Sequence, residues 1–281
     1  MTSKIWFITG ASRGFGRVWT QAALERGDKV AATARNIDTL DHLVNTFGEA
    51  IVPIALDVTD RAADFAAVAH AYERFGRLDV VVNNAGYGLF GTIEETSEAE
   101  ARAELETNLF GKLWITQAAL PYLRVQRSGH ILQVSSMGGV VAFPTLGVYH
   151  ASKWALEGFS ESLAQEVAGF GIKVTIIEPG GYATDWGGSS AAHAAPLPAY
   201  HGVRAAAAKF IADYPLGDPE ATGEAILAVV DAEQPPLRVF FGAPPLRIVR
   251  DAYTARLATW DDWEDVSVAA QGTERQPTSV A

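Results

Sequence analysis

The segment from Tyr149 to Lys153 places a phenol and an amine four residues apart. If this segment is helical, both side chains lie on the same helix face and can act together. A tyrosine is a poor base at neutral pH, because its reference pKa is about 10. A neighbouring ammonium group favours the phenolate, so we expect Lys153 to lower the pKa of Tyr149. Such a phenol could donate a proton to a ketone oxygen or accept one from an alcohol.

A second group of residues, near the N-terminus, suits the binding of a phosphate. Gly10, Gly14 and Gly16 lie between an apolar, strand-like run and a helical pattern. Glycines permit a tight turn that approaches a pyrophosphate closely, and the free N–H groups at the helix start can face its oxygens. A glycine-rich turn is weak evidence alone, but the first turn of a doubly wound sheet is where a dinucleotide binds.

Strand-like and helix-like segments alternate along the chain. The apolar runs predict strands over residues 4–9, 29–34, 51–58, 78–82, 130–134 and 173–177. Helical spacing predicts helices over residues 15–26, 37–47, 60–75, 97–127 and 149–168, with a kink at Pro121 in the longest. This alternation predicts a Rossmann-like α/β fold, in which a doubly wound parallel sheet carries helices on both faces.

The rest of the chain adds expected features to a single domain over residues 1–270. Residues 181–200 are rich in Gly, Ala, Ser and Pro, which favours a mobile loop over a packed element. We expect this loop to begin a substrate lid over about residues 181–215. A strand is expected over residues 238–241, a helix over about 246–260, and a frayed polar tail over 271–281.

The spacing Gly-x-x-x-Gly-x-Gly after Thr9, together with Tyr149-x-x-x-Lys153, resembles the short-chain dehydrogenase/reductase family over about residues 4–184. The resemblance implies a nicotinamide cofactor and hydride transfer between an alcohol and a carbonyl. It also implies two more catalytic residues beside Tyr149 and Lys153. Ser136, thirteen residues before Tyr149, would hydrogen-bond the substrate oxygen, with Ser135 as the alternative. Asn108 corresponds to the family's asparagine that holds a water connected to the lysine.

The same resemblance implies a cofactor site that follows the carboxyl ends of the strands. Its expected members are Gly10, Ser12, Arg13, Gly14, Phe15, Gly16, Arg35, Asp57, Val58, Asn83, Ala85, Gly86, Tyr149, Lys153, Pro179, Gly180 and Thr184.

The end of the second strand predicts which nicotinamide cofactor binds. Ala34 stands where NAD-selective members of the family carry Asp, and Arg35 follows it. Arg13, in the glycine-rich turn, supplies a second guanidinium group, and two such groups can hold a 2′-phosphate. We therefore expect NADP(H), with two solvated surface arginines as the alternative interpretation.

The bulk composition argues against several other classes of protein. The chain has 281 residues, a net charge of −11 and no cysteine. An acidic surface repels nucleic acid and anionic membranes, and no apolar run is long enough to span a bilayer. Disulfides and thiolate chemistry are excluded. We expect a cytoplasmic carbonyl reductase that needs no metal, acts on a small carbonyl or alcohol substrate, and forms a homodimer or homotetramer.

Two other functions are compatible with the same motifs: a non-catalytic NADP(H)-sensing regulator, and a lyase or epimerase that uses the same fold. The complete set Asn108, Ser136, Tyr149 and Lys153 favours hydride transfer, because a sensor has no need of all four. Segments 87–92, 140–148 and 181–209 are rich in apolar and aromatic residues, so we expect a neutral, hydrophobic ketone or secondary alcohol as substrate.

Overall fold

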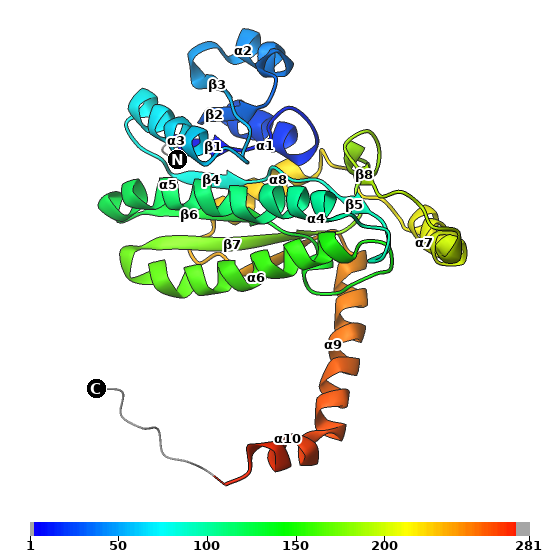
Figure 1. Cartoon of the computed structure of the whole chain (residues 1–281). Coiled ribbons are helices and arrows are strands. Elements are labelled where there is room, and N and C mark those ends of the chain that lie inside the picture. The colour runs from blue at the N-terminus through cyan, green and yellow to red at the C-terminus, as the bar shows by residue number, and fades with distance from the viewer. Residues whose placement is uncertain (1–2, 274–281) are drawn as a thin grey trace.

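Seven parallel strands form the central sheet of the computed structural model, which describes residues 3–273 (Figure 1). Along the chain these strands are β1 (Ile5–Ile8), β2 (Lys29–Ala34), β3 (Ile51–Ala55), β4 (Val80–Asn83), β6 (Gly129–Val134), β7 (Ile172–Pro179) and β9 (Arg238–Phe241). Their order across the sheet is β3-β2-β1-β4-β6-β7-β9. The order reverses at β1, which is the arrangement of a doubly wound Rossmann-like sheet.

Helices cover both faces of this sheet. They are α1 (Gly14–Glu25), α2 (Asp41–Phe47), α3 (Arg61–Phe75), α4 (Glu98–Leu105), α5 (Gly111–Gln126), α6 (Gly147–Val167), α7 (His201–Asp213), α8 (Thr222–Asp231), α9 (Pro244–Asp262) and α10 (Glu264–Gln271). Side chains of α1 and α8 pack into one core cluster, and side chains of α3, α5 and α6 pack into another. The predicted fold class is confirmed.

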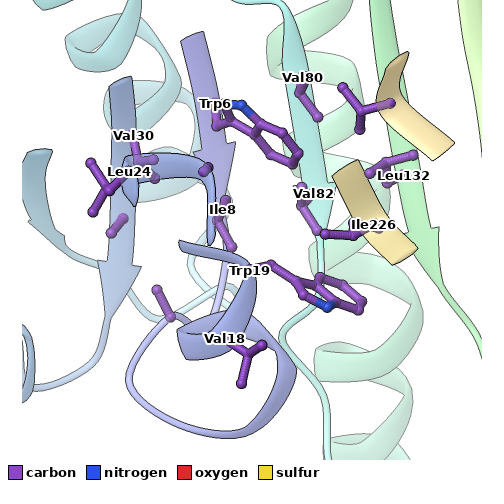
Figure 2. Packing of buried hydrophobic residues seen from close by; sticks show 14 of the residues in the cluster. Trp6, Ile8, Val18, Trp19, Leu24, Val30, Val80, Val82, Leu132 and Ile226 are labelled. Atoms are coloured by element: carbon purple, nitrogen blue, oxygen red, sulfur yellow. The ribbon is translucent and has the colours of Figure 1, made fainter. Parts of the chain in front are cut away.

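Two fully buried tryptophans lie in the core cluster beside α1 and α8 (Figure 2). The indole N–H of Trp19 donates to the hydroxyl of Thr222 at 2.9 Å, which ties α1 to α8. That of Trp6 donates to the carboxylate of Asp28 at 2.8 Å. Both aromatic bodies are therefore buried without an unsatisfied N–H. This packing fixes the start of α1, where the glycine-rich turn lies.

The long helical segment expected over residues 97–127 is present, and Ser97 with Glu100 forms the capping box that begins it. Its irregularity does not lie where we predicted it. Helix α5 continues through Pro121, whereas Glu106–Phe110, between α4 and α5, form a π-helical turn. Such turns often occur at functional sites, and Asn108 lies in this one.

The expectation that residues 181–200 form an unpacked loop is wrong. Ala192–His193 form β8, which pairs in parallel with β5 (Leu89–Phe90). Asp185–Gly187 form a 3₁₀ turn, and α7 follows directly after Tyr200. The small residues misled the prediction, because aromatic contacts hold this segment on the body: the rings of Phe90 and His193 stack at 5.2 Å.

The C-terminal helix is longer than expected. Helix α9 extends to Asp262, and α10 follows it at an angle (Figure 1). Of the predicted tail, residues 274–281 lie outside the described residues. Among residues 3–273, no helix is both long and apolar enough to cross a membrane.

Candidate active site

One large cleft, of about 1710 Å³, lies where the strands of the sheet end. It brings together most of the residues that the sequence predicted. The expected residues that line it are Gly10, Ser12, Arg13, Gly14, Phe15, Arg35, Asp57, Val58, Ala85, Gly86, Ser136, Tyr149, Lys153, Pro179, Gly180 and Thr184. Gly16, Asn83 and Asn108 do not line it.

Tyr149 and Lys153 lie in the first turns of α6 and are both buried. The amine of Lys153 is 5.6 Å from the centre of the Tyr149 ring and donates to the carbonyl oxygen of Val134 at 3.0 Å. The ring of Trp186 approaches the Tyr149 ring to 5.0 Å. The expected pair therefore lies on one helix face, at the wall of the cleft.

The expected lowering of the Tyr149 pKa is not found. Burial raises the pKa of Tyr149 above its ordinary value, the contact with the Ser136 hydroxyl opposes this, and the nearby Glu104 adds to it. Burial also lowers the pKa of Lys153 to about 8. Desolvation outweighs charge attraction here because both groups are withdrawn from water. In this state the phenol is a proton donor.

Ser136 is the serine that faces this pair. It begins the 3₁₀ turn Met137–Gly139, and its hydroxyl accepts from the N–H of Gly138 at 3.0 Å. The hydroxyl of Ser135 lies instead beside Glu157 of α6. Adjacent residues at the end of a strand point to opposite sides, which explains why only Ser136 contacts Tyr149.

Asn108 supports the site from behind. Its amide nitrogen lies within hydrogen-bond distance of the Tyr87 carbonyl (2.9 Å), Glu104 Oε1 (3.0 Å) and Ser152 Oγ (3.2 Å). Its Oδ1 accepts from the N–H of Tyr87 at 3.0 Å. Protein partners thus engage the whole side chain, which joins the Tyr87 segment to α6.

Two buried charged residues flank Asn108 along the helix and were missed in the sequence. Glu104 is fully buried, burial raises its pKa to about 7, and its Oε2 has no hydrogen-bond partner. Lys112 donates to the carbonyls of Asn83 (2.6 Å) and Val134 (3.0 Å), and burial holds its pKa well below the usual range. Glu104 and Lys112 each lie four residues from Asn108, and this spacing indicates that they share one helix face with the predicted catalytic asparagine.

His150, next to Tyr149, holds the segment between β6 and α6. Its Nε2 accepts from the N–H of Phe143 at 2.9 Å, so its Nδ1 carries the proton and donates to the carbonyl of Gly138, also at 2.9 Å. Burial lowers the pKa of His150, in agreement with a neutral ring. This histidine was in the predicted motif, but its positioning role was not foreseen.

The glycine-rich turn fits a bound pyrophosphate. Gly10 and Gly14 have φ angles of +66° and +54°, which other residues rarely adopt. A Cβ on Gly16 would collide with the carbonyl oxygen of Gly10, whereas a Cβ on Gly14 would meet nothing closer than 3.9 Å. The turn is therefore tight within the protein and open on its cleft side.

The two asparagines that follow β4 have different environments. Asn84 lines the cleft and donates from Nδ2 to the carbonyls of Thr9 (2.9 Å) and Gly10 (3.1 Å), which fixes the glycine-rich turn. Asn83, which we expected to contact the cofactor, is fully buried and donates to the Thr116 hydroxyl at 3.0 Å. It supports the sheet because its side chain points toward α5.

The end of β2 opens into the same cleft. Ala34, Arg35, Asp57 and Val58 all line it. Arg13 has a contact that we did not expect: its Nη1 lies 3.0 Å from Oδ2 of Asp185, and both side chains are about half exposed. Hydrogen bonds from the hydroxyls of Ser189 and Ser190 lower the pKa of Asp185 below its usual value, and the Arg13 guanidinium adds to this effect.

The other end of the cleft is apolar and aromatic. The Phe143 ring stacks with the Phe210 ring of α7 at 5.4 Å, and the Phe90 ring lies 5.3 Å from that of Trp186. Val203, Ala207 and Ile211 of α7 line this end too. Trp186 and α7 therefore give the cleft an apolar wall that begins at Tyr149.

Comparison with known proteins assigns the class. A family model described as short chain dehydrogenase matches residues 4–195, and the chain belongs to that family. It is therefore an oxidoreductase with the short-chain dehydrogenase fold.

Individual relatives agree with this class. Oxidoreductase BOA17 of Botryotinia fuckeliana (strain B05.10) is 43% identical over 272 residues, which are 95% of this chain and 99% of the relative. A short-chain dehydrogenase structure from Streptomyces avermitilis is 39% identical, with a TM-score of 0.91, and covers 96% of this chain and 98% of its own. A short-chain dehydrogenase from Burkholderia cenocepacia J2315, in complex with NADP, is 27% identical with a TM-score of 0.74, over 92% and 97% of the two chains.

Proposed function

We propose that this protein is an NADPH-dependent reductase of neutral, hydrophobic ketones or aldehydes, which also oxidises the matching secondary alcohols. The main observation in support of this proposal is that Ser136, Tyr149 and Lys153 share one cleft with an open glycine-rich turn and an apolar wall. The cleft thus joins a site for an anionic dinucleotide to a proton donor and an apolar chamber.

When bound, the nicotinamide cofactor supplies the hydride that adds to the carbonyl carbon, or accepts it in the reverse reaction. The chain provides the rest. The Ser136 hydroxyl hydrogen-bonds the substrate oxygen, and the Tyr149 phenol donates its proton to that oxygen as the C–H bond forms. The raised pKa of Tyr149 keeps the phenol protonated before the transfer. Lys153, fixed on the Val134 carbonyl, offers its ammonium group beside the phenolate that results.

Support for NADP(H) over NAD(H) comes from the end of β2. Arg35 and Arg13 both line the cleft, and the uncharged Ala34 stands where NAD-selective members of the family carry a ribose-binding Asp. A guanidinium group binds a phosphate in bidentate fashion, and an Asp at this position would repel it. The NADP complex of the Burkholderia cenocepacia relative agrees with this preference.

Support for a hydrophobic substrate comes from Phe90, Phe143, Trp186 and Phe210, which surround the chamber beyond Tyr149. Loops carry specificity in such folds, and here both the lid and α7 present apolar side chains. The cytoplasmic location and the homo-oligomeric state expected from the sequence stay predictions.

The test is the oxidation of NADPH, followed by its absorbance, with a panel of aryl and alkyl ketones and their carboxylated analogues. Turnover of the neutral ketones supports the proposal. Tight NADPH binding without turnover of any compound would instead favour the NADP(H)-sensing regulator, and product formation without net NADPH oxidation would favour a lyase or epimerase.

A further inference from the structure

The C-terminal helices α9 and α10 extend away from the body of the protein (Figure 1). Helix α9 contacts the body at Pro245, which is buried, and again past its middle. There the guanidinium group of Arg256 lies 5.1 Å from the ring of Trp154 on α6, and 4.9 Å from the ring of Tyr253 on its own helix. We call residues 244–271 the C-terminal arm.

The arm carries an apolar stripe that faces solvent. Its exposed members on α9 are Leu246, Tyr253, Leu257 and Trp260, and the half-buried Val249 lies in the same row. They recur every three or four residues, which is the spacing of one helix face. Leu257 is 53% exposed and Trp260 is 62% exposed, and the stripe continues past the end of α9 with Trp263 at 61%. Soluble monomers rarely leave a contiguous apolar surface of this kind uncovered.

The arm is not peculiar to this chain. The Streptomyces avermitilis structure covers 96% of this chain with a TM-score of 0.91, and the uncovered remainder is shorter than the arm.

The charged residues on one flank of the stripe indicate what kind of molecule packs against it. Arg247 and Arg250 lie in the first half of α9, while Asp261 lies in its last turn, on the same side of the stripe. An antiparallel pair of α9 helices centred between Tyr253 and Leu257 sets Arg250 of one copy opposite Asp261 of the partner subunit. A parallel pair would turn this flank toward the opposite flank of the second copy's stripe, so that Arg250 would not meet Asp261 of the partner subunit. Arg250 and Asp261 are therefore complementary to each other in the antiparallel direction only.

The available area is also adequate. Five exposed apolar residues of the stripe, each burying about 100 Å², would give on the order of 1,000 Å² over two copies, which lies at the lower end of the range of specific interfaces. An anionic bilayer is the poorer fit, because Asp261, Asp262, Glu264 and Asp265 surround the exposed tryptophans.

We propose that the C-terminal arm is a dimerisation element: the α9 helices of two copies of this chain pack antiparallel along the apolar stripe. The Arg250–Asp261 contacts between the copies, two per dimer, set the direction of the pairing. This inference does not depend on the proposed catalytic function, since assembly is measured without substrate or cofactor.

The test is the molar mass of the full-length chain in solution, by sedimentation or light scattering, over a range of concentrations. We expect a dimer, or a larger assembly that contains it. Leu257→Glu places a charge in the middle of the stripe and should remove this association. Val125→Glu is the matched control, because Val125 is an 80% exposed apolar residue on α5, outside the arm.

Charge reversal tests the direction of the pairing. Arg250→Asp and Asp261→Arg should each raise the dimer dissociation constant by about tenfold or more, because each creates two like-charge contacts. The double variant should restore dimerisation, since it exchanges the partners within each pair. A monomeric wild-type chain overturns the inference, as does a dimer unaffected by Leu257→Glu. Single reversals that the double variant fails to rescue overturn the antiparallel geometry.

Tryptophan fluorescence distinguishes two alternatives to a second copy of the chain: a membrane on the stripe, or the chain's own tail. If the wild-type chain is monomeric and binds phosphatidylglycerol vesicles through the arm, the surface belongs to a membrane. If it is monomeric and its arm tryptophans become exposed only when residues 274–281 are removed, the chain's own tail covers the stripe. Either result would overturn the proposal that the arm is a dimerisation element.

Discussion

Oε1 of Glu104 lies 3.0 Å from Nδ2 of Asn108, and Oε2 of the same carboxyl group is buried without a partner. Asn108 therefore helps to hold this carboxyl group beside the active site, in a region from which water is withdrawn. Burial raises its pKa to about 7, while Lys153 and the Leu89 backbone favour the charged form. Glu104 in turn raises the pKa of both Lys153 and Tyr149.

Replacing Glu104 by Gln should change the pH profile of ketone reduction. Activity in this direction is lost as pH rises through the pKa of the proton donor. The substitution removes a negative charge that raises this pKa, so the alkaline limb should move toward lower pH, by about one unit. The wild-type profile should also show an ionisation near pH 7, from Glu104 itself, that the variant lacks. The measurement is kcat against pH with saturating NADPH.

The control for this experiment is Glu98→Gln, because Glu98 is a highly exposed glutamate of the same helix. It should reproduce the wild-type profile. A Glu104→Gln enzyme with reduced activity but an unchanged profile would show that Glu104 has a structural role only.

Tyr149→Phe should reduce turnover by about 10²- to 10⁴-fold, the usual contribution of a general acid. The phenyl ring keeps its packing against Trp186, so NADPH affinity and thermal stability should stay close to those of the wild type. Stopped-flow or steady-state NADPH oxidation measures the first effect, and NADPH fluorescence the second. Substantial residual activity would show that another group protonates the substrate.

Much of the cleft was predictable from sequence because its residues follow strand ends at characteristic spacings. The glycine-rich turn, Ser136 and the Tyr149–Lys153 pair each depend on local geometry: a tight turn, a strand end and one helix face. The parallel sheet then brings these local units to one edge. This is why the sequence alone assigns the segments 10–16, 34–35, 57–58 and 179–184 to one site.

The residues that sequence reasoning missed depend on packing between distant segments. Lys112 reads as an ordinary helical lysine until β4 and β6 bring the carbonyls of Asn83 and Val134 to its amine. The raised pKa of Tyr149 has the same origin, because Trp186, which is distant in sequence, packs on the Tyr149 ring and contributes to its burial. Sequence spacing can show that two groups share a helix face, but it cannot show how far the folded protein removes that face from water.

A pH-dependent effect on stability is expected at Asp64, a fully buried residue of α3 whose carboxylate oxygens have no hydrogen-bond partner. Burial raises its pKa to about 8, and Asp60 and Asp57 add to this. The unfolded chain therefore ionises Asp64 at lower pH than the folded chain, so stability is lost as pH rises from about 4 toward 8. Asp64→Asn removes this loss and should stabilise the protein by up to about 5 kcal/mol above pH 8.

Thermal melting of the wild type and Asp64→Asn across this range measures the difference. The two melting temperatures should converge near pH 4 and diverge as pH rises. Asp213→Asn, at an exposed ion pair with Lys209, is the control and should show no such divergence. A constant offset between wild type and Asp64→Asn would contradict the raised pKa.

Phe210→Ala should narrow the range of substrates. Phe210 stacks on Phe143 and lines the chamber, so its loss removes apolar contact with a bulky substrate. We expect kcat/KM for large aryl ketones to fall by about tenfold or more, with little change for a short aliphatic ketone. Lys209→Ala, an exposed neighbour on α7 outside the chamber lining, should leave both values unchanged. Equal losses for both ketones would indicate a general disturbance of the lid.

Arg35→Asp should reverse the cofactor preference. The substitution removes a guanidinium group from the end of β2 and places a carboxylate where it repels a 2′-phosphate and can accept hydrogen bonds from ribose hydroxyls. We expect the NADPH-to-NADH ratio of kcat/KM to fall by about 100-fold, close to the upper value for charge-assisted hydrogen bonds. Dissociation constants of both dinucleotides, from fluorescence, report the change independently of turnover. Arg17→Ala is the control, because Arg17 pairs with Glu220 and does not line the cleft. Equal efficiency of the wild-type enzyme with both dinucleotides would show that Arg13 and Arg35 do not select the 2′-phosphate. The main role of the Arg13 guanidinium would then be to form the ion pair with Asp185.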